Sequence, residues 1–116
     1  MRTDGRVVYM GGASTTKLLL SPTALNNGTW HHLLVTVVLA GSNETTAMYV
    51  DGVLVASGNT SKAATVYSGW WRVGFGKVPT GTGYPATGNF TGSVDDVAVY
   101  ATALSATRVA AHYAAR

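Results

Sequence analysis

Two pairs of adjacent ionisable residues are the first candidates for chemistry in this chain of 116 residues: Asp95 and Asp96, and His31 and His32. Two carboxylates could supply the acid and the nucleophile of a glycosidase, and two histidines could bind a metal ion or serve as acid and base. Both pairs fall in predicted β-strands, where neighbouring side chains point to opposite faces. Neither pair can therefore act together on one bond or one ion, and the sequence favours a non-catalytic protein.

Asp95 shares a face of its predicted strand with Val97 and Val99, so the sequence predicts a half-buried carboxylate there. Such a group needs hydrogen-bond donors or a cation. We expect a structural acceptor that ties the strand to neighbouring backbone, with a calcium ion as the alternative partner of Asp95. No calcium-loop pattern is present, and other carboxylate ligands are few: Asp4, Glu44, Asp51 and Asp96.

Aromatic side chains exposed over a groove are the usual means of holding a sugar, because the C–H face of a pyranose packs on a ring while its hydroxyls bond to amides. Trp70 and Trp71 are neighbours in a predicted strand, so only one of them can face a single core. The alternative is that both tryptophans are core residues, one on each face. The candidate ligand-binding residues are three aromatic side chains and two polar partners: Trp71, Tyr84, Tyr67, Asn89 and His32.

Short strands joined by turns must position these residues. The Asp51-Gly52 dipeptide predicts a type I′ hairpin turn, and turn chemistry accounts for Asp51 better than a ligand or calcium contact does. Polar loops are predicted at 41–45, 59–64 and 76–88, of which the last is the longest. The apolar or β-branched runs predict strands at 6–10, 16–20, 30–39, 47–50, 53–57, 66–75 and 92–100.

Two of these elements have distinctive patterns. Residues 30–39 are apolar on both sides, which is typical of a strand in the middle of a sandwich or covered on both faces. A short helix is predicted to follow the 92–100 strand. Ser105 is its expected N-cap, and Leu104 is expected to pack on Val109.

Composition narrows the class of protein. The chain is long enough for one domain, residues 1–116, with a modest core. Hydrophobic residues make up 47% and charged residues 11%, which suits a β-rich extracellular or assembly protein. No apolar run reaches the roughly 18 residues that membrane insertion requires. The net charge of +3 comes from scattered residues, so nucleic-acid binding is not expected, and the absence of cysteine excludes disulfides and thiolate metal sites.

Three motifs resemble the LamG-like members of the concanavalin A-like jelly-roll superfamily: Gly28-Thr-Trp-His-His, Tyr49-Val-Asp-Gly, and Gly92-Ser-Val-Asp-Asp-Val with its closing Ala103-Leu-Ser turn. The resemblance covers about 27–113. It implies an all-β, antiparallel jelly-roll sandwich with a short C-terminal helix, and a role in the fold for Trp30 and both histidines. The exposed member of the histidine pair remains a candidate ligand contact.

The superfamily includes glycoside hydrolases, whose carboxylates lie at alternate positions of one strand together with several Glu residues. This chain has a single Glu, Glu44, in a predicted turn. This departure argues against enzyme activity. We expect a non-catalytic extracellular or cell-surface module that recognises carbohydrate through the 76–88 loop and an exposed tryptophan, without a required cofactor.

A second departure concerns the N-terminal part. The family usually has further strands before the equivalent of 6–9, including a central one that pairs near the closing strand, and this chain is shortened there. Such a sandwich exposes backbone edges and apolar faces. We therefore expect a fragment, or self-association or a partner chain that covers the gap. The alternative function is a structural subunit of a repeated assembly, such as a phage virion decoration or tail protein on the virion surface.

Overall fold

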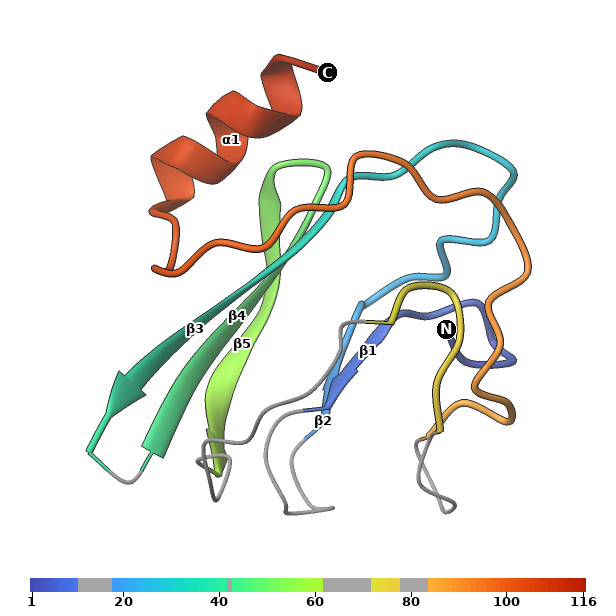
Figure 1. The fold of residues 1–116 in the computed structure, drawn as a ribbon, viewed down its shortest axis with the longest axis horizontal. Coiled ribbons are helices and arrows are strands. Elements are labelled where there is room, and N and C mark those ends of the chain that lie inside the picture. Colours follow the sequence, from blue (N-terminus) through green and yellow to red (C-terminus); the bar gives the residue numbers. More distant parts are fainter. Residues whose placement is uncertain (11–17, 42, 62–71, 78–83) are drawn as a thin grey trace.

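The structure is a computed structural model, in which the described residues form two antiparallel sheets and a C-terminal helix (Figure 1). The described ranges are 1–10, 18–41, 43–61, 72–77 and 84–116. The smaller sheet pairs β1 with β2, and the larger sheet has the order β3-β4-β5. The element bounds are β1 Val8–Met10, β2 Leu18–Leu20, β3 Leu33–Ala40, β4 Asn43–Val50, β5 Val53–Ser61 and α1 Ala106–Ala114.

The inner face of the larger sheet looks toward β1 and β2. Thr46 and Met48 alternate on this face of β4 and are almost fully buried. Gly58 of β5 pairs with Thr46, and a Cβ atom on Gly58 would lie 3.4 Å from the side chain of Leu19 in β2. Tyr9 of β1 is half-buried, and this burial is the main cause that raises the pKa of its hydroxyl. The prediction of a β-sandwich is confirmed.

The turn between β4 and β5 has the predicted type I′ geometry. Asp51 and Gly52 have φ angles of 52° and 78°, and Val50 pairs with Val53 across the turn. Gly52 is required for a second reason, because a Cβ atom there would lie 3.0 Å from the Cβ of Tyr113 in α1. The sharp turn thus also makes room for the helix.

The C-terminal helix begins where the sequence predicts. The Ser105 side chain accepts a hydrogen bond from the backbone N–H of Arg108, as expected of an N-cap. Val109 is fully buried and Leu104 is half-buried. The helix lies beside the turn end of the larger sheet, away from β1 and β2 (Figure 1).

The pairing of β4 with its neighbours extends further than predicted. Once the turn sets the register, β4 pairs with β5 as far as Asn43 and Ser61. The predicted turn at 41–45 is therefore wrong beyond its first residues: Glu44 lies in a strand and is 4% exposed. The predicted loop at 59–64 is likewise wrong for 59–61, and its remainder lies outside the described residues.

The strands at the N-terminal end are shorter than predicted, and one predicted strand is largely untested. β1 begins at Val8, and the first residues of the predicted 16–20 strand lie outside the described ranges. Of the predicted 66–75 strand only 72–75 is described, and there Phe75 forms a single bridge with Asn89.

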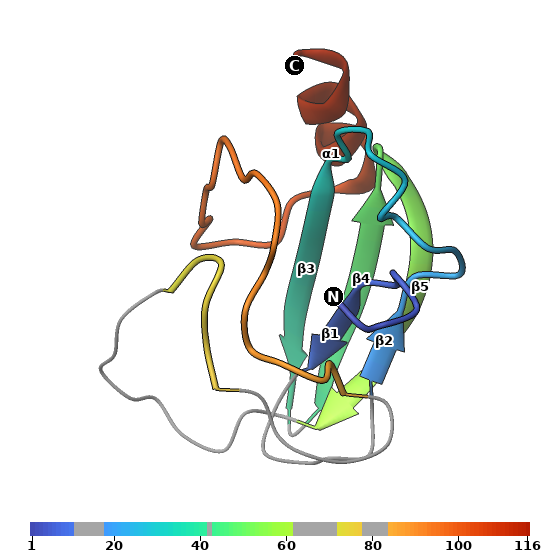
Figure 2. The same cartoon turned by 90° about the vertical axis from the view of Figure 1, so that its right-hand side faces the viewer.

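The apolar strand predicted at 30–39 begins only at Leu33, and its expected place in the sheet is wrong. Within the described part of the chain, β3 is an edge strand that pairs with β4 alone and is not in the middle of the sheet. Trp30 precedes it and is 62% exposed. Figure 2 shows the free side of β3 at the left of the sheet. Among the described residues no second neighbour completes the pairing of this strand.

The predicted strand at 92–100 is wrong. These residues form no ladder, and every one of them is exposed. Asp96 has a φ of 51°, which interrupts the alternation of side chains. Asp95 is therefore not half-buried; its Oδ1 accepts a hydrogen bond from the N–H of Asp96 at 2.9 Å. A β-branched run becomes a strand only where a neighbouring chain supplies hydrogen-bond partners, and here the described residues supply none.

Candidate functional site

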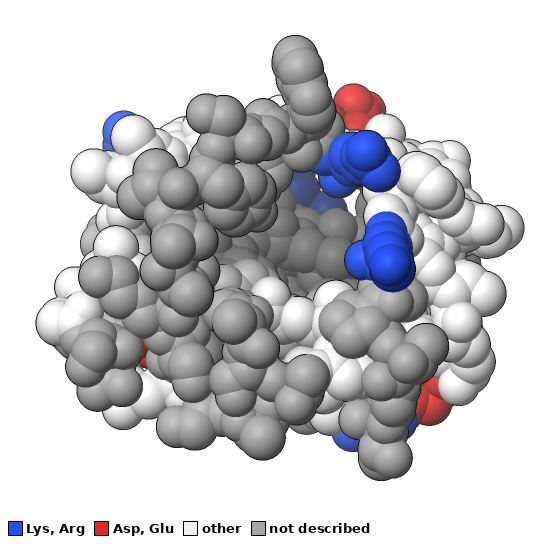
Figure 3. Space-filling model, turned by 60° about the horizontal axis from the view of Figure 1, so that its bottom comes forward, with Lys and Arg blue, Asp and Glu red and all other residues white. Residues whose placement is uncertain are grey.

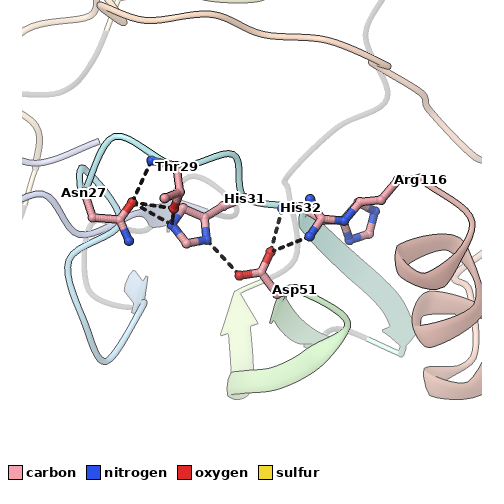
Figure 4. Close-up of polar contacts among 6 residues, drawn as sticks. All are labelled: Asn27, Thr29, His31, His32, Asp51 and Arg116. Carbon is pink, nitrogen blue, oxygen red and sulfur yellow. Dashed lines mark hydrogen bonds and ion pairs between the residues drawn. The ribbon is translucent and has the colours of Figure 1, made fainter.

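A polar network surrounds Asp51 at the turn end of the larger sheet (Figure 4). Its Oδ2 atom lies 2.7 Å from Nδ1 of His31, and its Oδ1 accepts the backbone N–H of His32 at 2.9 Å. The guanidinium of Arg116 lies 3.8 Å from Oδ1. One carboxylate thereby joins the turn, the residues before β3 and the C-terminal end of the chain.

The other ring nitrogen of His31 also meets acceptors. Its Nε2 lies 3.1 Å from Oδ1 of Asn27 and 3.2 Å from the hydroxyl of Thr29. Thr29 donates both its N–H and its hydroxyl to that Asn27 oxygen, which is therefore an acceptor for Nε2 when that ring nitrogen carries a proton. Both ring nitrogens thus face oxygens, and the imidazole is fixed at each end.

Electrostatics at Asp51 favour its ionised form. Partial burial raises the pKa of its carboxyl, but the hydrogen bonds from His31 and from the N–H of His32, together with the charge of Arg116, outweigh burial, and the pKa is lowered. No nucleophile lies among these partners. The network therefore stabilises the turn, as turn chemistry predicted for Asp51.

His32 belongs to this end of the molecule and not to a ligand groove. Its ring is half-buried, with its centroid 6.1 Å from that of Tyr113. Its Nδ1 atom is buried and has no hydrogen-bond partner among the described residues. Arg116 stacks on the ring of Tyr113, with its guanidinium carbon 4.0 Å from the ring centroid.

A shallow groove of about 250 Å³ lies elsewhere, between β1 and the segments 72–77 and 84–90. Two antiparallel backbone contacts hold these segments together: the N–H of Gly76 donates to the carbonyl of Gly88 at 2.9 Å, and the N–H of Phe90 donates to that of Gly74 at 2.8 Å. We call it the Phe75/Phe90 groove. Its described lining residues are Met1, Val8, Met10, Arg72, Gly74, Phe75, Gly76, Pro85, Thr87, Gly88, Asn89 and Phe90.

The lining combines exposed rings with polar groups. Phe75 and Phe90 are 63% and 40% exposed, and Asn89 and Arg72 are among the residues that line the same groove. None of the five acidic residues is among the described residues that line it. The lower side of the molecule is visibly hollowed, with Lys and Arg side chains beside the hollow (Figure 3). Rings, an amide and a cation can together hold a polar ligand that has an apolar face.

The structure brings only part of the predicted ligand set to this groove. Asn89 lines it, and half-buried Tyr84 precedes Pro85, which also lines it. His32 lies in the Asp51 network instead. Trp71 and Tyr67 lie outside the described residues, and so does Trp70.

Sequence reasoning missed the residues that dominate the groove: Phe75, Phe90 and Arg72. A usable signal exists, because the two phenylalanines flank the predicted 76–88 loop. Aromatic residues on both sides of a long loop indicate that its ends are held together. Here the Phe75–Asn89 bridge does so and places both rings at the neck of the loop.

Asp95, the weak metal candidate, is exposed beside Asp96. Within the described ranges, no three His, Cys, Asp or Glu side chains gather where they could hold a metal ion. Calcium at this position remains a prediction, and two neighbouring carboxylates would supply only part of the six to eight oxygens that it takes.

The fold and the sequence define the class of protein. The family model described as concanavalin A-like lectin/glucanases superfamily matches residues 2–110. The chain therefore belongs to this superfamily, as the three motifs predicted. LamG-like domains of this kind are typically extracellular or at a surface.

One solved structure is similar over most of the chain. It is the 2.1 Å crystal structure of residues 221–444 of an S-layer domain-containing protein from Clostridium thermocellum ATCC 27405. The TM-score is 0.61 at 20% identity, and the match covers 97% of this chain and 65% of that one. It shows the same fold, and this chain spans about two thirds of that structure. The search of curated proteins finds no match. No helix in the described part of the chain is long and apolar enough to cross a membrane.

Proposed function

We propose that this domain is an extracellular, non-catalytic binding module that holds carbohydrate in the Phe75/Phe90 groove. The observation that carries the proposal is a groove lined by two exposed phenylalanines together with Asn89 and Arg72. Sugar C–H faces pack on such rings, and hydroxyl groups bond to Asn89 and Arg72. Membership of a superfamily that contains lectins supports the same conclusion.

The positions of the carboxylates support a module without catalytic activity. A glycosidase needs two carboxyl groups that flank one bond. Here Asp4 forms an ion pair with Arg2, Asp51 is bonded within the turn network, and Glu44 is buried in β4. Asp95 and Asp96 lie on the exposed segment, away from the groove lining.

Affinity electrophoresis through gels that contain a panel of polysaccharides tests the proposal. For a polysaccharide that retards the protein, Phe75→Ala and Phe90→Ala should each weaken binding roughly tenfold, because stacking on one ring contributes about 1.4 kcal/mol. Trp30→Ala is the matched control, since Trp30 is equally exposed but does not line the groove. Trp71→Ala and Tyr67→Ala test the earlier nominations in the same gels.

If Trp30→Ala weakens retardation while both phenylalanine variants bind normally, carbohydrate does not bind in the Phe75/Phe90 groove. Adding EDTA to the gels tests whether a calcium ion takes part; the proposed binding requires no cofactor, so retardation should not change.

A second candidate function is supported by a separate observation. Large apolar side chains are exposed along β3 and along 92–100. Such a surface is typical of a protein that is covered by self-association or by a partner chain. We propose as the alternative a structural subunit of a repeated surface assembly, of the cell or of a phage virion. The similar solved protein is named for its S-layer domain, which agrees with a surface assembly.

Light scattering over a dilution series, with and without EDTA, separates the two functions. A stable monomer that binds glycan supports the binding module alone. A concentration-independent oligomer supports the assembly subunit, and an oligomer lost in EDTA would indicate calcium at the contact.

A further inference from the structure

The free edge of β3 lacks the features that normally protect an edge strand. Such strands usually carry a charge, a proline or a bulge, or are covered by another element. β3 contains no charged residue and no proline, and its pairing with β4 has no bulge from Leu33 to Ala40. The irregularity in this sheet lies between β4 and β5, at Met48 and Tyr49. No strand among the described residues pairs with the outer side of β3, so its backbone groups there can accept another strand.

Large apolar side chains of β3 are exposed on both faces of the sheet, although Thr36 is buried and Leu34 and Val37 are half-buried. Leu33, Val35 and Leu39 share the inner face with the buried residues of β4, yet they are 37–63% exposed. Val38 on the opposite face is 51% exposed. The short β1–β2 ribbon packs on β4 and β5, where Tyr9 bonds to Thr46 and Leu19 lies beside Gly58.

A second uncovered segment runs beside β3. Within the described chain, no backbone-to-backbone hydrogen bond involves residues 91–104. Val94, Val97 and Val99 are 49–60% exposed, although valine favours a paired, half-buried strand. Figure 2 shows this orange segment on the free side of β3, and Figure 1 shows it passing in front of the same strands.

We propose that β3 and residues 93–100 form the two sides of an acceptor site for an extended strand of a partner chain. The proposal deepens the second candidate function and rests on it. Both sides have unpaired backbone groups, and only an extended strand can bond to two such edges at once. Its side chains would cover Val35 and Leu39 on the inner face and Val38 on the outer face.

The charges at the site define the chemistry of the strand. β3 carries no charge, so the strand must be apolar or small on both faces. Asp95 and Asp96 are exposed, and no ion pair within the described ranges involves them. A Lys or Arg near the middle of the strand would therefore be favoured, and an acidic residue there would be disfavoured.

The probe is a blocked nine-residue peptide that alternates valine and threonine around a central lysine. Binding to the full chain is followed by fluorescence anisotropy, and the contact is located by amide hydrogen exchange. We expect amides on both sides, in 33–40 and in 93–100, to exchange more slowly with the peptide present.

Two control peptides and one control variant sharpen the test. A central proline should abolish binding, because it removes a ladder donor. A central glutamate should weaken binding roughly threefold, the effect of one exposed charge pair. The double variant Asp95→Asn and Asp96→Asn should remove this preference for lysine over glutamate without affecting the fold, since both side chains are exposed.

The outcomes distinguish this proposal from the functions it accompanies. Slower exchange along β5 alone, or no binding of the lysine peptide to a monomeric chain, overturns the acceptor site. A dimer that protects β3 without peptide also overturns it, because a second copy is then the occupant while the assembly function stands. Glycan retardation of the same sample reports separately on the Phe75/Phe90 groove.

Discussion

The turn end of the larger sheet and its free edge at β3 differ in how completely their polar groups are bonded. At the turn, one carboxylate bonds to two histidines and lies near the C-terminal arginine, and a helix packs against the glycine beside it. At the free edge, β3 pairs on one side only and most of its large apolar side chains are exposed, as are those of a valine-rich segment with no backbone hydrogen bonds among the described residues. Apart from the buried Nδ1 of His32, the polar groups of the first region are bonded within the described chain, and the outer backbone groups of the second are not.

This difference predicts that the turn end contributes to the stability of the fold, whereas the free edge contributes to association with other chains. Residues at the turn have partners whose loss would leave charges or N–H groups unbonded, so changes there should cost folding free energy. Exposed apolar side chains at the free edge have no hydrogen-bond or ion-pair partner among the described residues, so changes to them should alter association and leave folding nearly unchanged. Substitutions at the two regions test this distinction.

The largest effect is expected at Asp51. Asp51→Ala removes the acceptor of His31 and of the His32 N–H, and places alanine at a φ of 52°. The free energy of unfolding should fall by about 3 kcal/mol, measured by urea denaturation. Asp51→Asn tolerates the same φ and keeps one acceptor, so it should lose about 1 kcal/mol. Equal losses in both variants would show that the ionised carboxylate, and not the backbone conformation at this position, carries the effect, and would contradict the smaller loss expected for asparagine.

A smaller loss is expected where the turn meets the helix. Gly52→Ala and Gly28→Ala both place alanine at a positive φ, of 78° and 82°. A Cβ atom at Gly28 meets no described atom within 4 Å, whereas one at Gly52 lies 3.0 Å from Tyr113. We expect losses of about 1 kcal/mol for Gly28→Ala and about 2 kcal/mol for Gly52→Ala. If the two losses are the same, α1 does not press on the turn.

The turn should also respond to acid. The folded-state pKa of Asp51 is below its ordinary value of 3.8, so folding favours the ionised carboxylate. Its contribution is therefore fully present above about pH 4 and is lost as the pH falls through the folded-state pKa. Thermal unfolding between pH 7 and pH 2 should show a steeper acid loss for the wild type than for Asp51→Asn. Parallel curves would contradict this assignment.

The smallest effect on folding is expected at the free edge. Val97→Thr changes a side chain that is 60% exposed, and the free energy of unfolding should change by less than about 0.5 kcal/mol. Val109→Thr makes the same change at a fully buried position and should lose about 2 kcal/mol. A loss at Val97 as large as that at Val109 would mean that the segment is packed, and the comparison of the two regions would fail.

Features that depend on neighbouring residues could be predicted from the sequence, whereas those that depend on distant segments could not. The turn at Asp51-Gly52 and the cap at Ser105 depend on neighbouring residues and their φ angles, so local chemistry predicted both. The groove depends on the segments 72–77 and 84–90 meeting β1, and of its described lining residues only Asn89 was among the nominated ones. Phe75, Phe90 and Arg72 were missed: the two phenylalanines beside the predicted 76–88 loop indicate where its ends meet, but not that a groove forms there.

The residue pattern of this chain was enough to determine its family, its β-rich sandwich, its hairpin turn and its helix cap, because each follows from motifs or from contacts a few residues apart. Tertiary structure alone decided that β3 is an edge, that 92–100 is unpaired and that Asp95 is exposed. An apolar alternation records which face of a strand prefers burial. Whether that strand is paired depends on a neighbour distant in sequence or in another chain, which the pattern itself does not contain.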